Sequence, residues 1–318
     1  MPLVSSTFQP PAYLRNGHVQ TLVSALASHR VNTPLEPERL ELEDGDFLEM
    51  HWLRKGRNRV AILSHGLEGC AEDGYIRGMA AALDGAGWDA LAWSFRGCGK
   101  EPNRLLRFYH SGETGDLGRV IRHAAATYSR IVLVGFSLGG NLILKYLGEG
   151  KPHPAVAGAA AISAPVDLAA SARVLDRRRG NRLYLRRFIK TLVAKVEAKA
   201  VLFPDQIDVS GSRAIRTFEE FDGRYTAPLH GFRDADDYWK QSSARQYLPA
   251  ITASTLLLNA LDDPFLAPEC FPFEEATRSR WLFLETPAFG GHLGFIDLAH
   301  GFRPWYERRV VEFLDQTR

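Results

Sequence analysis

Residues 131–147 have the sequence Ile-Val-Leu-Val-Gly-Phe-Ser-Leu-Gly-Gly-Asn-Leu-Ile-Leu-Lys-Tyr-Leu. The four apolar residues 131–134 predict a buried strand, and the apolar run from residue 141 predicts a helix. Between them lies Gly135-Phe136-Ser137-Leu138-Gly139. A tight turn of this kind strains the serine backbone and needs small flanking residues, because larger ones would collide with neighbouring elements. The stretch therefore predicts a Ser137 hydroxyl held out at the carboxyl end of a sheet.

Short apolar runs alternate with helical segments on both sides of this turn. Such alternation is typical of βαβ units, which build a parallel sheet covered by helices. The expected strands are residues 59–64, 89–94, 131–134, 156–162, 255–259 and 281–285. The expected helices are residues 73–86, 113–127, 137–148, 272–277 and 304–315. The sequence thus predicts an α/β fold with a mostly parallel central sheet.

An antiparallel hairpin is expected ahead of the parallel strands. Residues 40–43 and 47–53 are short strand-like runs, and Asp44-Gly45-Asp46 lies between them. An Asp-Gly pair between two such runs is a strong hairpin signal. We therefore expect the sheet to begin with this hairpin.

The alternation stops between about residues 165 and 250, where several helices and no strand are expected. Because α/β order resumes afterwards, we interpret residues 1–318 as a single domain. Residues 165–250 are then a helical lid inserted into that domain. Inside the insertion, Arg177-Arg178-Arg179 precedes a basic amphipathic pattern with apolar positions at Leu183, Phe188, Leu192, Val193 and Val196.

Two interpretations of this basic segment stay open. One is a solvated helix that packs a single face on the domain. The other is a lid that admits an acyl chain and makes transient contact with an anionic membrane surface.

Charge and cysteine content exclude several classes of protein. The 39 Lys and Arg nearly balance the 37 Asp and Glu, so no overall field attracts nucleic acid. The three cysteines are odd in number and widely spaced, which favours free thiols in a reducing compartment. The first residues lack a basic segment followed by an apolar one, so no secretory signal is expected. We expect a cytoplasmic protein that binds no nucleic acid.

No motif indicates a cofactor or a metal ion. Gly148-Glu149-Gly150-Lys151 lacks the earlier glycine of a phosphate-binding loop, and Arg96-Gly97-Cys98-Gly99 is no dinucleotide fingerprint. The His and Cys residues do not have zinc spacing. We therefore expect neither a cofactor nor a metal site.

A reactive serine hydroxyl needs a general base, and the acid and the histidine should follow the serine in the chain. His292 stands in a Gly-Gly-His-Leu-Gly loop just after the last expected strand, where it can reach over the serine. It is the preferred base. His300 competes with it, although its apolar neighbours favour a packed structural role. The remaining downstream histidines, in a Pro-flanked segment and in the insertion, are His153 and His230.

The acid should follow the strand expected at residues 255–259, and Asp262 and Asp263 both do. Asp263 precedes Pro264, which favours an extended backbone that aims the carboxylate toward His292. Asp262 could instead cap the turn or the following segment. We favour Asp263 over Asp262 on this local geometry.

Negative charge that develops on a carbonyl oxygen during acyl transfer needs hydrogen-bond donors. The backbone amide of Leu138 is one expected donor, since it begins a helix whose dipole favours an anion. The loop His65-Gly66-Leu67-Glu68-Gly69 follows the first parallel strand, and the amide of Leu67 is the second expected donor. An ordinary strand-end turn is the alternative interpretation of this loop.

Several motifs spread over nearly the whole chain carry a resemblance to a known family. They are Phe8-Gln9-Pro10-Pro11, Arg15-Asn16-Gly17-His18-Val19-Gln20-Thr21, His65-Gly66-Leu67-Glu68-Gly69, Arg96-Gly97-Cys98-Gly99, Tyr109-His110-Ser111-Gly112-Glu113-Thr114, Gly135-Phe136-Ser137-Leu138-Gly139-Gly140-Asn141 and Asp262-Asp263-Pro264-Phe265. Together they resemble the YheT-like branch of the α/β-hydrolases, which is related to eukaryotic α/β-hydrolase-domain lipid esterases.

The resemblance implies an α/β-hydrolase fold and a Ser-Asp-His triad that maps onto Ser137, Asp263 and His292 by motif position. It also implies a carboxylesterase or lipid-acting hydrolase, while some relatives resemble acyltransferases. For residues 15–21 we expect a structural cap beside the active site.

The expected activity is cleavage of carboxylic ester or thioester bonds through an acyl-enzyme on Ser137, with a small acyl ester or lipid as substrate. One alternative is an acyltransferase that forms esters from an acyl donor and an alcohol. Another is a non-catalytic binding protein on the same fold. The sequence sets neither the acyl chain nor the oligomeric state.

Overall fold

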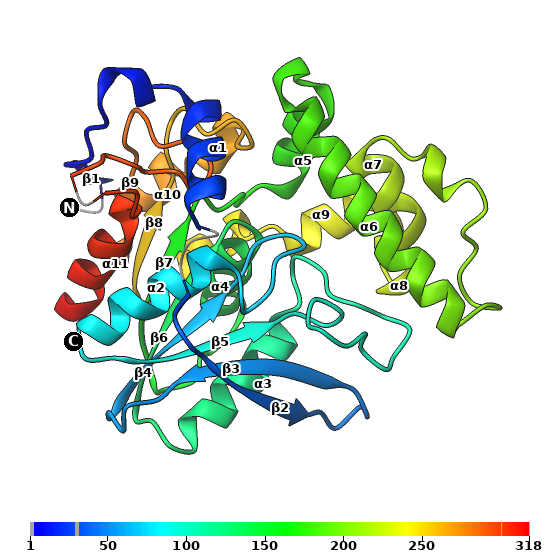
Figure 1. The fold of residues 1–318 in the computed structure, drawn as a ribbon, viewed down its shortest axis with the longest axis horizontal. Helices are drawn as coiled ribbons and strands as arrows, with labels where there is room; N and C mark the ends of the chain where they lie inside the picture. Colours follow the sequence, from blue (N-terminus) through cyan, green and yellow to red (C-terminus); the bar gives the residue numbers. More distant parts are fainter. Residues whose placement is uncertain (1–2, 29–31, 300, 318) are drawn as a thin grey trace.

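A mostly parallel sheet forms the centre of the protein (Figure 1). The computed structural model describes residues 3–28, 32–299 and 301–317. In this part of the chain the strand order is β1-β9-β8-β7-β6-β4-β5-β3-β2. The strands are β1 (Leu3–Val4), β2 (Glu36–Glu41), β3 (Phe47–Leu53), β4 (Arg59–Ser64), β5 (Asp89–Ser94), β6 (Arg130–Phe136), β7 (Val156–Ile162), β8 (Ser254–Leu258) and β9 (Leu282–Glu285).

Antiparallel pairing in the sheet involves β3, which forms the predicted hairpin with β2, although β2 spans Glu36–Glu41 and not residues 40–43. β3 pairs antiparallel with β2 and with β5, whereas the other neighbouring strands run parallel. The turn of the hairpin is held by the buried guanidinium of Arg96, which forms ion pairs with Asp44 (2.9 Å) and Asp46 (3.0 Å). Arg96 also pairs with Asp116 of the following helix at 2.6 Å. The arginine of the Arg96–Gly99 motif therefore fixes the hairpin to the body of the domain.

Helices cover both faces of the sheet (Figure 1). α2 (Gly74–Gly85) and α11 (Trp305–Gln316) pack on one face, and α3 (Thr114–Ala125) and α4 (Leu138–Glu149) on the other. Successive side chains of a strand point to opposite faces. Along β4, Ala61 and Leu63 accordingly join the core of α2 and α11, while Val60 and Ile62 join the core of α3 and α4. This two-sided burial explains why the parallel strands are continuously apolar.

Between β7 and β8 the chain leaves the sheet and forms only helices (Figure 1, green to yellow). The short segment at Asp222–Thr226 is a π-helical turn, a form found mostly as single turns and frequently at functional sites. The helices are α5 (Leu168–Arg177), η2 (Arg179–Asn181), α6 (Arg182–Leu202), η3 (Ser212–Ala214), α7 (Phe218–Phe221), η4 (Asp222–Thr226), α8 (Ala227–Leu229), α9 (Ala235–Ser242) and η5 (Arg245–Ala250).

The basic segment of the insertion is helix α6, and it buries one face. Its buried apolar residues are spaced at helical intervals, whereas Leu183 is 76% exposed, so its assignment to the apolar face was wrong. The 3.6-residue period places Leu183 on the opposite side of the helix from Leu185 and Ile189. No helix in the described ranges is both long and apolar enough to cross a membrane.

Near the N-terminus the structure has two elements that the sequence patterns do not predict. β1 adds to the edge of the sheet beside β9. α1 (Gly17–Ser28) follows the short turn η1 (Ala12–Leu14) and packs near the carboxyl ends of the strands. The remaining short helices are η6 (Pro268–Cys270) and α10 (Phe273–Arg278).

Candidate active site

Ser137 occupies the strained turn that its sequence context predicts. It lies between β6 and α4 with φ 51° and ψ −117°, a left-handed conformation that non-glycine residues rarely adopt. The turn is tight, because a Cβ on Gly139 would lie 2.4 Å from the carbonyl oxygen of Ser64. The backbone amide of Ser137 donates to Ile162 O at 2.9 Å. These contacts hold the hydroxyl at the carboxyl end of the sheet.

The imidazole of His292 joins Ser137 to Asp263. Ser137 Oγ lies 3.0 Å from His292 Nε2, and His292 Nδ1 lies 2.9 Å from Asp263 Oδ2. Since a carboxylate only accepts hydrogen bonds, the ring proton belongs on Nδ1, which leaves Nε2 free to accept from the serine hydroxyl. Asp263 is 3% exposed, so its charge is shielded from water. This geometry suits proton abstraction from Ser137.

The two adjacent carboxylates have different environments. Asp263 Oδ1 accepts from the amide of Phe265 at 2.9 Å, and its other oxygen faces His292. Asp262 points to the backbone instead, where Oδ1 accepts from the amide of Gly291 at 2.8 Å. Burial raises the pKa of Asp262. The structure therefore brings Asp263, and not Asp262, onto the imidazole.

The two competing histidines that the structure describes, His153 and His230, have hydrogen-bond partners away from Ser137. The ring nitrogens of His230 lie 2.8 Å from Thr226 O and 2.9 Å from Phe108 O. Burial lowers the pKa of His230 to about 4. His153 accepts at Nδ1 from the amide of Ala155 in a local turn. His300 lies outside the described residues.

The loop that carries Leu67 is pinned on both sides of that residue. The amide of Gly66 donates to Tyr75 Oη at 2.9 Å, and the amide of Glu68 donates to Tyr109 Oη at 3.0 Å. The intervening amide of Leu67 makes no hydrogen bond within the described residues. Leu67 and Leu138 both border the cavity at Ser137. Both residues therefore lie at the same cavity as the serine.

His65 holds this loop through contacts of its two ring nitrogens with the backbone. Its Nε2 accepts from the amide of Phe95 at 3.0 Å, and Nδ1 lies 2.7 Å from Gly66 O. Burial lowers the pKa of His65 to about 3, so the ring is neutral and donates from Nδ1. The histidine of the His65–Gly69 motif is thus a buried structural group.

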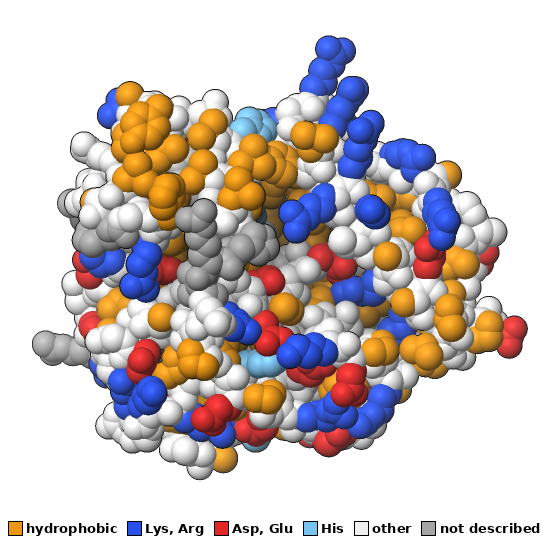
Figure 2. All heavy atoms as spheres, in the orientation of Figure 1, with side chains coloured by type: hydrophobic (Ala, Val, Ile, Leu, Met, Phe, Trp, Pro, Cys, Tyr) orange, Lys and Arg blue, Asp and Glu red, His pale blue; other side chains and the backbone are white. Residues whose placement is uncertain are grey.

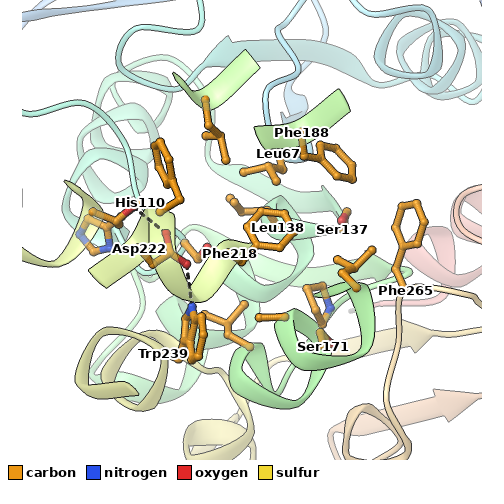
Figure 3. A pocket seen from close by; sticks show the side chains of 18 of the residues that line it. Leu67, His110, Ser137, Leu138, Ser171, Phe188, Phe218, Asp222, Trp239 and Phe265 are labelled. Atoms are coloured by element: carbon orange, nitrogen blue, oxygen red, sulfur yellow. Dashed lines mark hydrogen bonds between the residues drawn. The ribbon is translucent and has the colours of Figure 1, made fainter. Parts of the chain in front are cut away.

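An apolar cavity of about 110 Å³ lies beside Ser137 (Figure 3). Leu138 and Phe218 lie between Ser137 and Asp222 in that view, so the cavity leads from the serine hydroxyl toward Asp222. Most of the residues that line the cavity belong to the insertion. The sequence does not indicate which residues of the insertion do so. Its apolar lining residues include Leu67, Phe108, Leu138, Leu168, Ala172, Leu175, Phe188, Leu192, Phe218, Phe221, Phe265 and Leu266.

Polar side chains also contribute to the far end of the cavity. Asp222 of η4 accepts from Thr226 Oγ1 at 2.7 Å and from Trp239 Nε1 at 2.8 Å. Burial raises the pKa of Asp222 to about 6. His110 also borders this end of the cavity. The sequence does not indicate Asp222 as a site residue, because only the tertiary fold brings η4 to the cavity, and it assigns no role to His110 within the Tyr109–Thr114 motif.

Among the described residues, no His, Cys, Asp and Glu side chains gather into a group that could hold a metal ion. Burial raises the pKa of Cys98 to about 12, which disfavours the thiolate form.

The surface near the site combines apolar and basic side chains (Figure 2). Tyr13, Leu22 and Leu26 are 70%, 52% and 73% exposed on η1 and α1. The basic side chains of α5 and α6 form a ridge on the other side of a hollow (Figures 1 and 2). The two sides meet where His18 stacks on Tyr184 with ring centroids 5.8 Å apart.

Comparison with known proteins places this architecture in a family. A family model described as "alpha/beta hydrolase fold" matches residues 61–297. The chain is 34% identical to the protein named "Putative esterase YheT" of Escherichia coli (strain K12), over 98% of this chain and 93% of that one. It is 28% identical to mouse phospholipase ABHD3, over 93% of this chain and 75% of that one.

Solved structures of other proteins share the fold of this chain. An esterase of Pyrococcus furiosus, Pf2001, superposes with a TM-score of 0.61 at 17% identity, over 91% of this chain and 93% of that one. A bacterial membrane phospholipase A superposes with a TM-score of 0.59 at 19% identity, over 94% and 92%. The resemblance in sequence, together with the sheet order and the strained serine turn, shows that this chain belongs to the α/β-hydrolase fold family and to its YheT-like branch.

Proposed function

We propose that this protein is a serine hydrolase that cleaves carboxylic ester or thioester bonds, with Ser137 as nucleophile, His292 as general base and Asp263 as the acid. The observation that carries the proposal is the hydrogen-bonded chain from Asp263 through His292 to Ser137. Relatives named as esterases and phospholipases, together with the family membership, support ester hydrolysis as the activity of this protein.

In the first half of the reaction, Ser137 Oγ attacks the acyl carbon while His292 Nε2 takes the hydroxyl proton. The electron pair of the carbonyl moves onto its oxygen, which the amides of Leu67 and Leu138 stabilise. The carbon–oxygen or carbon–sulfur bond to the leaving group then breaks, and His292 returns the proton to the departing alcohol or thiol. Asp263 stabilises the imidazolium formed in between.

In the second half, water replaces the leaving group. His292 takes a proton from the water as its oxygen attacks the acyl-enzyme, and the proton passes to Ser137 as the free acid departs. The serine hydroxyl is regenerated. If an alcohol enters in place of water, the same intermediate gives a new ester, so product analysis with added ethanol separates hydrolysis from acyl transfer.

The cavity supports an acyl group of limited length. Its volume of about 110 Å³ is somewhat below the ~150 Å³ of an engineered apolar cavity that binds benzene. Phe188 and Phe218 contact one another with ring centroids 6.1 Å apart and contribute to its wall. A short, unbranched acyl chain fits this space, and longer chains require these aromatic side chains to move.

Contact with an anionic lipid surface is proposed as a second property of the site region. The exposed apolar side chains of α1 suit the interfacial layer of a membrane, and the exposed Arg186 and Arg187 of α6 suit anionic head groups. Sedimentation with phosphatidylglycerol vesicles should bring down the protein, and Arg186→Glu with Arg187→Glu should abolish this. Equal sedimentation with neutral phosphatidylcholine vesicles would contradict the electrostatic part of the proposal.

The activity itself is tested by Ser137→Ala. This variant should lose hydrolysis of p-nitrophenyl butyrate by at least about 10³-fold, because the remaining contacts can only bind and polarise the ester. Labelling of the native protein by a fluorophosphonate probe should disappear in the same variant. Turnover retained in a folded Ser137→Ala protein would rule out the assignment.

A further inference from the structure

The segment at residues 15–21, for which the sequence offers no mechanism, lies directly on the loop that carries His292. This histidine loop, residues 290–296, has no regular secondary structure. Its backbone has positive φ at Gly290, Gly291, Leu293 and Phe295. The amide of Phe295 donates to Gly290 O within the loop at 3.0 Å, but no helix or sheet ladder pairs the other backbone polar groups, which therefore need partners from outside the loop.

Helix α1 supplies several of these partners through side chains on one face. Thr21 Oγ1 accepts from the amide of His292 at 2.9 Å and donates to Gly17 O at 2.7 Å. Ser24 Oγ donates to Leu293 O at 2.6 Å. The spacing of residues 17, 20, 21 and 24 is that of a single helical face. The hydroxyl of Thr21 thus joins α1 directly to the backbone of His292.

Gln20 holds the other end of the loop. Its side chain is fully buried, and Oε1 accepts from the amide of Ile296 at 2.8 Å. Nε2 donates to Ile296 O at 3.0 Å and to Leu14 O at 3.1 Å. One amide side chain therefore satisfies both backbone groups of Ile296 and ties them to the turn before α1.

The start of α1 also touches the turn that carries the acid. A Cβ on Gly17 would lie 1.9 Å from Asp262 O, so only glycine allows this approach. Asp262 in turn accepts from the amide of Gly291 in the histidine loop. The acid turn, the histidine loop and α1 thus form one connected unit.

The polarity of α1 is the reverse of that of an ordinary surface helix. Its inward face carries Gln20, Thr21 and Ser24, all buried, while Leu22 and Leu26 on the outward side are exposed. A helix that served only to cover the core would present its apolar side inward. The inward polar groups instead form hydrogen bonds with the backbone of the histidine loop.

We propose that α1 is a positioning element for the general base, in which Thr21, Gln20 and Ser24 hold the histidine loop so that His292 stays within reach of both Ser137 and Asp263. This inference rests on the proposed function, since it assigns a role to groups behind His292. It gives the Arg15–Thr21 motif a task in catalysis without contact with the substrate. A misplacement of about 1 Å can cost about 10²-fold in rate, so small shifts of the loop matter.

The test compares Thr21→Val with Thr21→Ser in the full-length protein. Thr21→Val keeps the size of the side chain but removes both hydrogen bonds, and should lower kcat for p-nitrophenyl butyrate by about 10–100-fold with KM changed less than about 3-fold. Thr21→Ser keeps the hydroxyl and should retain kcat within about 3-fold. Equal kcat values for Thr21→Val and the native protein would overturn the proposal.

Thr277→Val is a matched control. Thr277 Oγ1 donates to Phe273 O at 2.7 Å, the same bond to the preceding turn that Thr21 makes, but on exposed helix α10. This variant should keep native kcat and KM. If Thr21→Val does not fold, Ser24→Ala gives a milder test with an expected kcat loss of about 3–10-fold, and native kcat in that variant would also contradict the proposal.

The two proposals fail in different ways. Activity retained in Ser137→Ala refutes the proposed function, whatever Thr21 does. An inactive Ser137→Ala protein combined with native kcat in Thr21→Val and Ser24→Ala leaves the proposed function standing and refutes the positioning role. A parallel rise in KM and fall in thermal stability with unchanged kcat would assign α1 a purely structural role, and would also overturn it.

Discussion

Lys195 of α6 forms a 2.7 Å ion pair with Glu68, the residue that follows Leu67 in the loop at the active site. Their side chains are only 12% and 11% exposed. Tyr109 Oη completes the contact by donating to Glu68 Oε1 at 2.8 Å. The helical insertion is therefore joined by a largely buried ion pair to the loop that carries a proposed oxyanion donor.

Removal of this cation should affect both stability and rate. Lys195→Met leaves the Glu68 carboxylate buried without its counter-ion, which we expect to lower the free energy of unfolding by about 2–3 kcal/mol. The activity should fall by about 5–10-fold, because Leu67 moves with Glu68. Urea unfolding and initial rates measure the two effects, and the double variant Lys195→Met with Glu68→Gln should recover most of the stability. A double variant no more stable than Lys195→Met would contradict this account.

The two adjacent carboxylates should respond very differently to amide substitution. Asp263→Asn should lower kcat by about 10³–10⁴-fold, because it disfavours the Nδ1–H tautomer of His292 and removes the charge that stabilises the imidazolium. Asp262→Asn should cost about 10-fold or less, since its oxygen only accepts from the Gly291 amide. Measured kcat values with the two effects reversed would make Asp262 the acid.

The buried carboxyl of Asp222 should make stability depend on pH. Burial raises its pKa from 3.8 to about 6 in the folded protein, so the folded state binds this proton more tightly than the unfolded state. The carboxyl therefore reduces stability as pH rises from about 4 to about 6, and the full penalty of about 3 kcal/mol is present above pH 6.

Asp222→Asn cannot ionise and can keep both hydrogen bonds, so its stability relative to the native protein should rise by about 1 kcal/mol between pH 5 and pH 8. Urea unfolding at the two pH values measures the difference. A difference that stays constant would show that Asp222 titrates normally.

The aromatic wall of the cavity should set the acyl-chain preference. Phe188 lies beside Phe265 and Phe218, with ring centroids 6.0 Å and 6.1 Å away. Phe188→Ala should enlarge the cavity and move the best p-nitrophenyl ester from about butyrate toward chains at least two carbons longer. Rates across esters of two to twelve carbons provide the measurement. An unchanged profile would place the acyl chain elsewhere.

The serine turn and its partners are readable from the sequence for a local physical reason. A strand, a serine between glycines and a helix are consecutive, so Ser137 and its strained backbone follow from one short stretch. The order of the later strands places Asp263 and His292 after strand ends, and the carboxyl ends of parallel strands meet at one edge. Periodicity likewise gives the parallel strands and the β2–β3 hairpin.

Features made by packing between distant segments could not be read in this way. Gln20 and Ile296 are 276 positions apart, and nothing local in residues 15–21 indicates that their side chains hold the histidine loop. Asp222 likewise carries no local signal in the sequence, although the fold brings it to the cavity beside Ser137.

Short-range patterns of apolarity and small residues at fixed spacing indicate the parallel strands, the strained serine turn and the order of the acid and the histidine after it. The contact of Asp263 rather than Asp262 with His292, the lining of the cavity by the insertion and the contact of α1 with the histidine loop emerge only from the folded molecule. These outcomes depend on side chains that meet across the fold, where a hydrogen bond of about 3 Å is set by the packing of whole elements and not by neighbours in the chain.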